Sequence, residues 1–252
     1  RHTWRIAVRL ADRGRGGSDY VHTQLMEGVS VEIDRIGNLF RFEPTARPYF
    51  IAAGIGITPI LPMIESTHRN GTDWHLLYLG RRKDSMPFLD QLSVFGDRVT
   101  AVESSTMGRV DLSTVIAANA DAHFYACGPE TLLDVLEDAV RKHPGTRLSV
   151  ERFTPRGTVG NGADTEFDVV LDSSDRVIPV RADQSMLSAL LEDGVRVRNS
   201  CGEGTCGSCE VVVLDGVPDH RDSILTDEER LDGDCMYVCV SRSRTATLTL
   251  DL

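Results

Sequence analysis

The chain has 252 residues, of which 41% are hydrophobic and 26% are charged. This is the composition of an ordinary globular protein, and the length allows two or three cores. No apolar run approaches the roughly 18 residues that a membrane-spanning helix needs, and no N-terminal pattern predicts a signal peptide. We therefore expect a cytoplasmic protein that does not bind membranes.

The net charge of −11 is concentrated towards the C-terminus. Residues 167–252 have 17 Asp and Glu against 8 Lys and Arg, whereas residues 1–166 have 21 against 19. An acidic module argues against nucleic-acid binding, because phosphates are neutralised by Lys and Arg. It favours a protein partner with a basic docking face, although plain solubility explains the same charge equally well.

The first 43 residues predict an incomplete domain. Trp4–Leu10 and Val29–Asp34 alternate as strands do, and Asp19–Met26 predicts a short helix between them. Two strands and one helix are too few to bury a core. We interpret residues 1–43 as the C-terminal part of a β-barrel whose first half is absent from this chain.

Residues 44–153 predict a doubly wound, parallel α/β domain. Apolar strands at Ile51–Ala53, Leu76–Leu79 and Phe124–Ala126 alternate with helices. This is the pattern of a parallel sheet that is covered on both faces. We expect the three strands to be neighbours in one sheet.

The turn after the first of these strands, "GIGITP", contains a G-x-G motif. Gly54 and Gly56 form the turn, Thr58 is expected to cap the next helix, and Pro59 takes the first helical position, where no N–H is needed. The helix N-terminus would then face a ligand, as anions prefer. A lone G-x-G is weak evidence, but "ACGPE" occupies the matching place after a later strand.

The last segment predicts a linker and a β-rich domain. Residues 154–165 contain one Pro and three Gly without periodicity, which is typical of a linker. In residues 166–252 we expect a hairpin, a helix that Gly194 ends, and two later strands. These elements are Phe167–Leu171, Val177–Val180, Ser185–Asp193, Glu210–Leu214 and Thr247–Leu250.

Three of the six cysteines lie in "CGEGTCGSC", with four residues between Cys201 and Cys206 and two between Cys206 and Cys209. The small residues between them let a loop wrap an inorganic core and direct amides at sulfur. C-x4-C-x2-C with a distant fourth Cys is the spacing of plant-type [2Fe–2S] ferredoxins. Structural zinc is the alternative, but it usually uses two C-x2–4-C pairs.

These residues resemble the phthalate dioxygenase reductase family. "SCGEGTCGSCEVVVLDGVPDHRDSILTDEE" carries the ligand loop and the "PDHRD…LTDEE" stretch typical of that family, and vanillate demethylase reductases share the layout of the whole chain. The resemblance implies a flavin barrel, a nicotinamide domain and a C-terminal β-grasp ferredoxin domain. It implies an NADH-dependent reductase that passes electrons through FMN to [2Fe–2S] and on to a Rieske-type oxygenase or demethylase.

The resemblance also implies residue roles. Cys239, separated from Cys209 by 29 residues, becomes the fourth ligand, and Cys235 a bystander thiol. "GIGITP", "GRR" and "CGP" resemble loops that surround the nicotinamide dinucleotide in the ferredoxin-reductase superfamily. The candidate catalytic residues are Thr58, Cys127 and Phe153. The candidate nicotinamide-site residues are Gly54, Gly56, Thr58, Gly80, Arg81, Asp84, Cys127, Gly128 and Pro129.

Several alternatives remain open at this point. A buried core side chain is the other interpretation of Cys127 and of Phe153. Asp84 favours NADH, because it can accept from a ribose hydroxyl and repels a 2′-phosphate, whereas Arg82 and Lys83 favour NADPH.

"GRGGS", with Gly16, Gly17 and Ser18, can present amides and a hydroxyl to a phosphate at a helix N-terminus, and a surface turn is its alternative. The resemblance implies that this segment binds the FMN phosphate. The family's R-x-Y-[ST] flavin motif is absent, so we expect weak FMN binding by this chain. We also expect a monomer. The other functions that fit are a free-standing NADH:acceptor reductase and a non-enzymatic metal-binding module.

Overall fold

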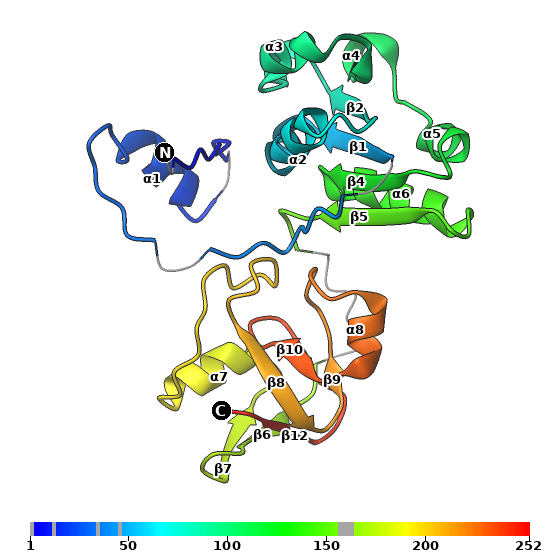
Figure 1. The fold of residues 1–252 in the computed structure, drawn as a ribbon. Helices are drawn as coiled ribbons and strands as arrows, with labels where there is room; N and C mark the ends of the chain where they lie inside the picture. The colour runs from blue at the N-terminus through cyan, green and yellow to red at the C-terminus, as the bar shows by residue number, and fades with distance from the viewer. Residues whose placement is uncertain (1–2, 12–13, 34–35, 45–46, 156–163) are drawn as a thin grey trace. The chain divides into compact units, whose positions relative to one another are not determined.

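The structure is a computed structural model that describes residues 3–11, 14–33, 36–44, 47–155 and 164–252. The chain divides into two compact units, Arg1–Glu151 and Arg152–Leu252 (Figure 1). The predicted linker falls mostly on residues 156–163, which lie outside the described residues. No helix among the described residues is long and apolar enough to cross a membrane.

The first unit is built on a five-stranded parallel sheet with the strand order β3-β2-β1-β4-β5. The predicted sheet is confirmed, although β2 and β4 each pair with β1 and not with each other. Two partly exposed strands, β3 and β5, were not predicted, because their short sequences alternate weakly. The strands are β1 (Pro48–Ala53), β2 (His75–Gly80), β3 (Val99–Glu103), β4 (His123–Cys127) and β5 (Arg147–Glu151).

Helices cover both faces of this sheet (Figure 1). Phe50 and Ala52 of β1 share a core with α2 (Ile57–Arg69), whereas Tyr49 and Ile51 share the opposite core with α5 (Leu112–Ala118) and α6 (Glu130–Arg141). Successive strand residues point to opposite faces, so β1 is buried on both sides. The shorter helices are η1 (Gly54–Gly56), η2 (Lys83–Ser85), α3 (Leu89–Leu92), η3 (Ser93–Arg98) and α4 (Ser104–Met107).

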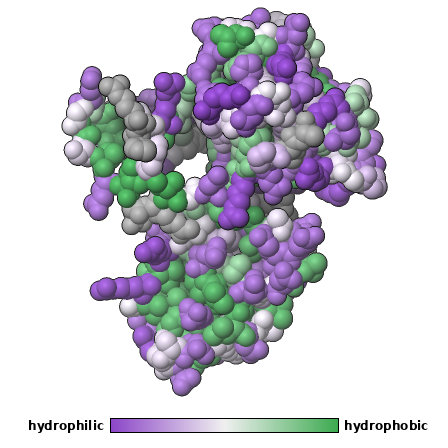
Figure 2. All heavy atoms as spheres, viewed as in Figure 1, coloured by the Kyte–Doolittle hydropathy of each residue, from purple (hydrophilic) through white to green (hydrophobic). Residues whose placement is uncertain are grey.

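The N-terminal segment forms one helix, α1 (Gly17–Thr23), close to the predicted one. The two predicted strands are wrong: no strand is assigned to the described residues from 3 to 44. A strand needs a partner for its backbone hydrogen bonds, and these alternating segments pair with nothing that is described. Their apolar side chains stay on the surface, with Ile6 76% and Val31 60% exposed (Figure 2). The assignment of residues 1–43 to a flavin barrel stays a prediction.

The second unit contains a five-stranded mixed sheet with the order β10-β8-β12-β6-β7, and β12 is parallel to β6. The helix α7 (Met186–Glu192) shares a core with the inner face of this sheet. The predicted hairpin, helix and later strands are confirmed. The strands are β6 (Phe167–Leu171), β7 (Arg176–Val180), β8 (Glu210–Asp215), β10 (Cys235–Tyr237) and β12 (Thr247–Leu250), with β9 (Pro218–Asp219) and β11 (Arg242–Ser243) as a separate pair.

Local sequence explains where α7 begins and ends. The Ser185 hydroxyl accepts from the Ser188 amide at 3.1 Å and caps the first turn. Gly194 follows the last turn with a φ of 81°, a conformation that suits Gly. A second helix, α8 (Asp227–Asp232), was not predicted, although Thr226 and Glu229 form a capping box at its start.

Candidate functional site

The sheet register brings the distant fourth cysteine to the cysteine loop. Cys201, Cys206 and Cys209 lie in the loop before β8, and Cys239 lies in the turn that follows β10. β10 pairs antiparallel with β8, so that Tyr237 is opposite Glu210. The Val238 amide then donates to the Cys209 carbonyl at 3.3 Å. Glu210 and Tyr237 are 27 residues apart in the sequence. Their pairing places Cys239 beside Cys209, which the spacing of the cysteines alone could not show.

The four sulfurs form two pairs. The Cys201 side chain hydrogen-bonds to the Cys206 side chain, and the Cys239 thiol hydrogen-bonds to Cys209 Sγ. Two pairs of thiolates are the donor set that two bridged iron atoms require. Structural zinc usually takes its ligands from two C-x2–4-C pairs, whereas these four cysteines cannot be divided into two such pairs, because 29 residues separate Cys239 from Cys209. The donor set therefore fits [2Fe–2S] better than zinc.

Backbone amides stabilise negative charge on this loop. Burial opposes ionisation of Cys201, but amide donors from Thr205 and Glu203 lower its pKa to about 6, with Glu203 N 3.2 Å from Cys201 Sγ. The hydrogen bond from Cys239 lowers the pKa of Cys209 to about 7 and raises the pKa of Cys239 itself. Thiolates are the forms that bind metals, so the folded loop is prepared for iron.

Cys235 has a different environment. It lies on β10 opposite Val212, and burial together with the nearby charges of Glu210 and Asp234 raises its pKa to about 11. A neutral thiol is a poor metal ligand. This supports Cys239 over Cys235 as the fourth ligand, and that assignment stays a prediction.

In the first unit, the two predicted Gly loops meet at the carboxyl ends of β1 and β4. A Cβ on Gly56 would lie 2.2 Å from the Cys127 carbonyl oxygen, and a Cβ on Gly128 would lie 2.9 Å from the Ala53 Cβ. The loops therefore touch through backbone, which only Gly permits. Open α/β sheets bind ligands at the carboxyl ends of their strands, so this edge is the candidate dinucleotide site.

Thr58 does not cap the helix, and this expectation is wrong. The helix α2 already begins at Ile57, after the single turn of η1. Thr58 is thus inside the first turn, where its hydroxyl donates to the Ile55 carbonyl at 2.9 Å. Pro59 is the third helical residue rather than the first. Thr58 still lies at the carboxyl edge of β1, and its catalytic role remains a prediction.

Cys127 and Phe153 differ sharply in exposure. Cys127 is fully buried as the last residue of β4, and burial with the nearby Glu151 raises its pKa far above the ordinary value. Burial also raises the pKa of Glu151. Phe153 is 47% exposed and belongs to the second unit. Burial gives Cys127 the features of a core thiol, whereas Phe153 is not a core residue.

The loop after β2 contains Gly80, Arg81 and Asp84. A Cβ on Gly80 would lie 2.3 Å from Met86 Cγ, so the buried Met86 side chain packs against the Gly80 backbone and would have to move for any larger residue. Asp84, the predicted ribose acceptor, forms an ion pair with Arg82 at 2.6 Å, and both side chains are more than 60% exposed. The two residues with opposite implications for NADH and NADPH thus neutralise each other.

The predicted FMN-phosphate loop lies at the start of α1. Gly16 is the N-cap with a φ of 94°, a conformation that suits Gly. The Ser18 hydroxyl accepts from the Ala11 amide at 3.1 Å. Gly17 is the first residue of the helix. The role of all three in phosphate binding stays a prediction.

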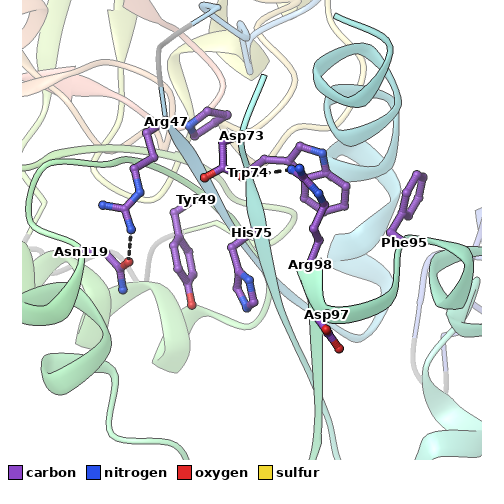
Figure 3. A pocket seen from close by; sticks show the side chains of 10 residues that line it. Arg47, Tyr49, Asp73, Trp74, His75, Phe95, Asp97, Arg98 and Asn119 are labelled. Carbon is purple, nitrogen blue, oxygen red and sulfur yellow. Dashed lines mark hydrogen bonds and ion pairs between the residues drawn. The ribbon is translucent and has the colours of Figure 1, made fainter. Parts of the chain in front are cut away.

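A pocket of about 640 Å³ lies at the opposite, amino-terminal edge of the parallel sheet (Figure 3). Trp74 and Phe95 line it with two arginines. Arg98 pairs with Asp73 at 3.1 Å, and Arg47 pairs with Asp121 at 2.6 Å. The cations of this pocket are therefore neutralised within the protein, and the pocket is not the candidate dinucleotide site.

Comparison with known proteins decides the family. Residues 169–244 match the 2Fe-2S iron-sulfur cluster binding domain. Phenoxybenzoate dioxygenase subunit beta of Ectopseudomonas oleovorans is 40% identical over 255 residues, which cover 100% of this chain and 79% of that protein. Phthalate dioxygenase reductase of Burkholderia cepacia is 34% identical over 259 residues, covering 100% of this chain and 80% of that protein.

The chain belongs to the phthalate dioxygenase reductase family. It is an oxidoreductase, the reductase component of an oxygenase system, and its C-terminal unit is a [2Fe–2S] ferredoxin domain. The phthalate dioxygenase reductase resemblance read from "CGEGTCGSC" and "PDHRD…LTDEE" is thus confirmed.

A solved structure adds a second kind of relative. An intact type IV self-sufficient cytochrome P450 monooxygenase matches with a TM-score of 0.86 and 39% identity. The match covers 96% of this chain but only 32% of that protein. The same fold is therefore also present as one part of a haem monooxygenase.

Proposed function

We propose that this reductase takes two electrons from NADH at the carboxyl edge of β1 and β4, and delivers them singly through FMN to the cluster. A nicotinamide gives a hydride whereas a [2Fe–2S] centre takes one electron at a time, so a flavin is needed between them. The paired cysteines, with amides directed at their sulfurs, are the observation that carries the proposal. The chain's own residues bind and orient these groups, and no acid–base side chain is required.

The nicotinamide edge is organised by backbone. At Gly56 the loop after β1 packs directly on the Cys127 carbonyl at the end of β4, with no room for a side chain at this position. A dinucleotide can then approach the amides of the η1 turn, beside Gly54. In this proposal Thr58 and Cys127 lie next to the nicotinamide, Phe153 covers the flavin, and residues 16–18 bind the FMN phosphate.

NADH is the proposed donor. The ion pair between Asp84 and Arg82 offsets one of the two side chains, Arg82 and Lys83, that would attract a 2′-phosphate. Arg81 precedes it and is exposed, so the loop still offers a cation for the pyrophosphate. The preference for NADH over NADPH depends on a surface ion pair, so we expect this preference to be modest.

The proposed acceptor is a Rieske-type oxygenase with a basic docking face. Four acidic residues of α8 are exposed on the ferredoxin domain, and in this proposal they contact the partner. Opposite charges steer association. Next to the cysteine loop, however, Arg196 and Arg198 are exposed. The surface near the cluster therefore has positive side chains, whereas the domain as a whole is acidic.

Charge reversal separates these two surfaces. Glu228→Lys with Asp232→Lys should slow electron delivery to the oxygenase about tenfold at low salt, without changing NADH oxidation by a small neutral acceptor. Arg196→Glu with Arg198→Glu is the matched variant and should have a smaller effect. The opposite order would mean that the partner's docking face is acidic.

A cytochrome P450 haem domain is a second candidate acceptor. The match to a P450 monooxygenase over 96% of this chain supports it. The two acceptors are distinguished by offering the reductase each purified partner under anaerobic conditions. Reduction of the Rieske centre is followed by EPR, and reduction of the haem is followed by the carbon monoxide difference spectrum. We expect faster reduction of the Rieske centre.

The function itself is tested by anaerobic spectroscopy of the chain supplied with saturating FMN, because we expect this chain to bind FMN weakly. NADH should bleach the iron–sulfur absorbance as fully as dithionite does. Dithionite reduces the cluster directly. Bleaching by dithionite but not by NADH would mean that the chain has a ferredoxin cluster but does not transfer electrons to it from NADH. A chain that neither reagent bleaches would contradict the cluster itself.

A further inference from the structure

Asp222, in the "PDHRD" stretch, is a buried acid beside the cysteine loop. Its side chain is fully buried. Oδ2 accepts from the amides of Ile224 at 2.9 Å and Leu225 at 2.8 Å, which closes a tight turn. Oδ1 has no hydrogen-bond partner among the described residues. A buried carboxylate is costly unless a cation lies close to it.

Arg230 supplies that cation and fixes the same turn. Its guanidinium donates to three carbonyl oxygens of the turn: those of Asp222 at 2.6 Å, Leu225 at 3.1 Å and His220 at 3.2 Å. Nη2 is also 3.4 Å from Asp222 Oδ2. The short helix α8 positions Arg230, and its capping box fixes the start of that helix.

The turn contacts the cysteine loop through Gly204. The Ser223 amide donates to the Gly204 carbonyl at 2.9 Å. Gly204 has a φ of 67°, and a Cβ there would lie 3.0 Å from the Asp222 Cα and 2.6 Å from a Val240 methyl. The Gly204 backbone in turn hydrogen-bonds to the Cys239 side chain.

We propose that Asp222 and Arg230 are positioning residues that set the reduction potential of the cluster. The hydrogen bonds of Arg230 fix the turn, and the contacts of the turn fix the position of Gly204. The Gly204 amide is thereby directed at the sulfur of Cys239. Hydrogen bonds to cluster sulfurs and nearby net charge are the two factors by which a protein tunes such a potential. This gives a physical role to the "PDHRD…LTDEE" stretch, which holds no cluster ligand.

The two residues should act with opposite signs. Arg230→Gln removes a positive charge and weakens the support of Gly204, and both effects disfavour the reduced, more negative cluster. Asp222→Asn keeps an acceptor for the turn amides but removes a buried negative charge, which favours the reduced cluster. A purely structural role would instead move both potentials in the same direction, because both changes loosen the same turn.

The test is an EPR-monitored redox titration of the full chain, loaded with iron and sulfide. At a fixed solution potential, we expect the ratio of reduced to oxidised cluster to fall about tenfold in Arg230→Gln, which is about 59 mV for one electron. The ratio should rise in Asp222→Asn. The control Arg181→Gln changes an exposed arginine of the same domain, paired with Asp183, and should leave the ratio unchanged.

Iron content is measured in every variant, so that loss of the cluster is distinguished from a shift of its potential. If Arg230→Gln retains too little iron, Arg230→Lys keeps the charge without the forked donors and should shift the ratio in the same direction by less. The proposal is overturned by shifts of the same sign in the Asp222 and Arg230 variants, or by unchanged ratios with full iron content. The inference depends on the cluster and not on the electron acceptor; a wild-type chain without iron would contradict the proposed function instead.

Discussion

The two candidate sites of this reductase are built in opposite ways. The cluster site is made of side chains, since four cysteines are its proposed ligands and hydrogen bonds lower the pKa of two of them, Cys201 and Cys209. The dinucleotide edge is made by the absence of side chains, since Gly56 and Gly128 let two loops meet through backbone. Binding at the side-chain site should therefore be sensitive to the chemical identity of the substituted residue. Binding at the backbone site should be sensitive to the size of the substituted residue. The following predictions test that difference, from the largest expected effect to the smallest.

The largest effect is expected at the cluster ligands. Cys239→Ser should remove most of the bound iron and the visible absorbance, because the second sulfur pair loses one member. Cys235→Ser is the matched control in the same strand and turn and should retain both, since the Cys235 thiol is held neutral by a pKa of about 11. Loss of iron from Cys235→Ser with retention in Cys239→Ser would reverse the ligand assignment.

A large effect is also expected from one added methyl group at the nucleotide edge. Gly56→Ala places a Cβ 2.2 Å from the Cys127 carbonyl oxygen, and the backbone must move. We expect a loss of about 1–3 kcal/mol of unfolding free energy and weaker NADH binding, measured by thermal unfolding and by NADH titration.

The size control is Gly37→Ala, whose added Cβ would meet no atom within 4 Å. It should leave both unfolding and NADH binding unchanged. If Gly56→Ala behaved like Gly37→Ala, the backbone contact between the two loops would not be the feature that shapes this edge.

A modest effect is expected on cofactor preference. Asp84→Asn releases Arg82 from its ion pair and removes a charge that repels a 2′-phosphate. The ratio of kcat/KM for NADPH to that for NADH should rise about fivefold, since an exposed pair is worth only about 1 kcal/mol. Steady-state kinetics with both nucleotides measure it, and an unchanged ratio would remove Asp84 from the specificity loop.

The smallest effect is a pH dependence of the nicotinamide unit. Burial, together with the charge of Arg147, lowers the pKa of His123 below its ordinary 6.5, so the unfolded chain binds more protons than the folded chain. The stability that this contributes is complete above pH 6.5 and is lost as the pH falls through the lower, folded-state pKa.

His123→Gln should therefore flatten the fall in denaturant midpoint between about pH 7.5 and pH 5.5. The exposed His22 on α1 provides the control His22→Gln, which should keep the full pH dependence. A steeper dependence in His123→Gln would contradict the buried, neutral state of this ring.

The same contrast explains how much the sequence could predict. Cysteine spacing favours one chemistry, so the cluster loop could be recognised from nine residues. The family could be recognised from that loop together with the "PDHRD…LTDEE" stretch and the layout of the chain. Strong strands such as β1 and β4 were found because they are apolar on both faces. The weakly alternating β3 and β5 were not, because edge strands receive only part of their burial from the sheet.

Other features could not be predicted because they arise from tertiary contacts. Thr58 was expected to cap α2, but the η1 turn moves the helix start to Ile57. The strands expected in residues 4–10 and 29–34 found no partner among the described residues. Asp222 was visible only as part of a family motif, and Arg230 lies just after it. The contact of Asp222 with Gly204 and with Arg230 needed the folded loop.

The most direct test of the account is chemical analysis of the purified chain for iron, acid-labile sulfide and zinc, with EPR of the dithionite-reduced protein. The account predicts about two iron atoms and two sulfides per chain, as a [2Fe–2S] centre contains, and a rhombic EPR signal that is lost in Cys239→Ser. One zinc per chain without labile sulfide would contradict it.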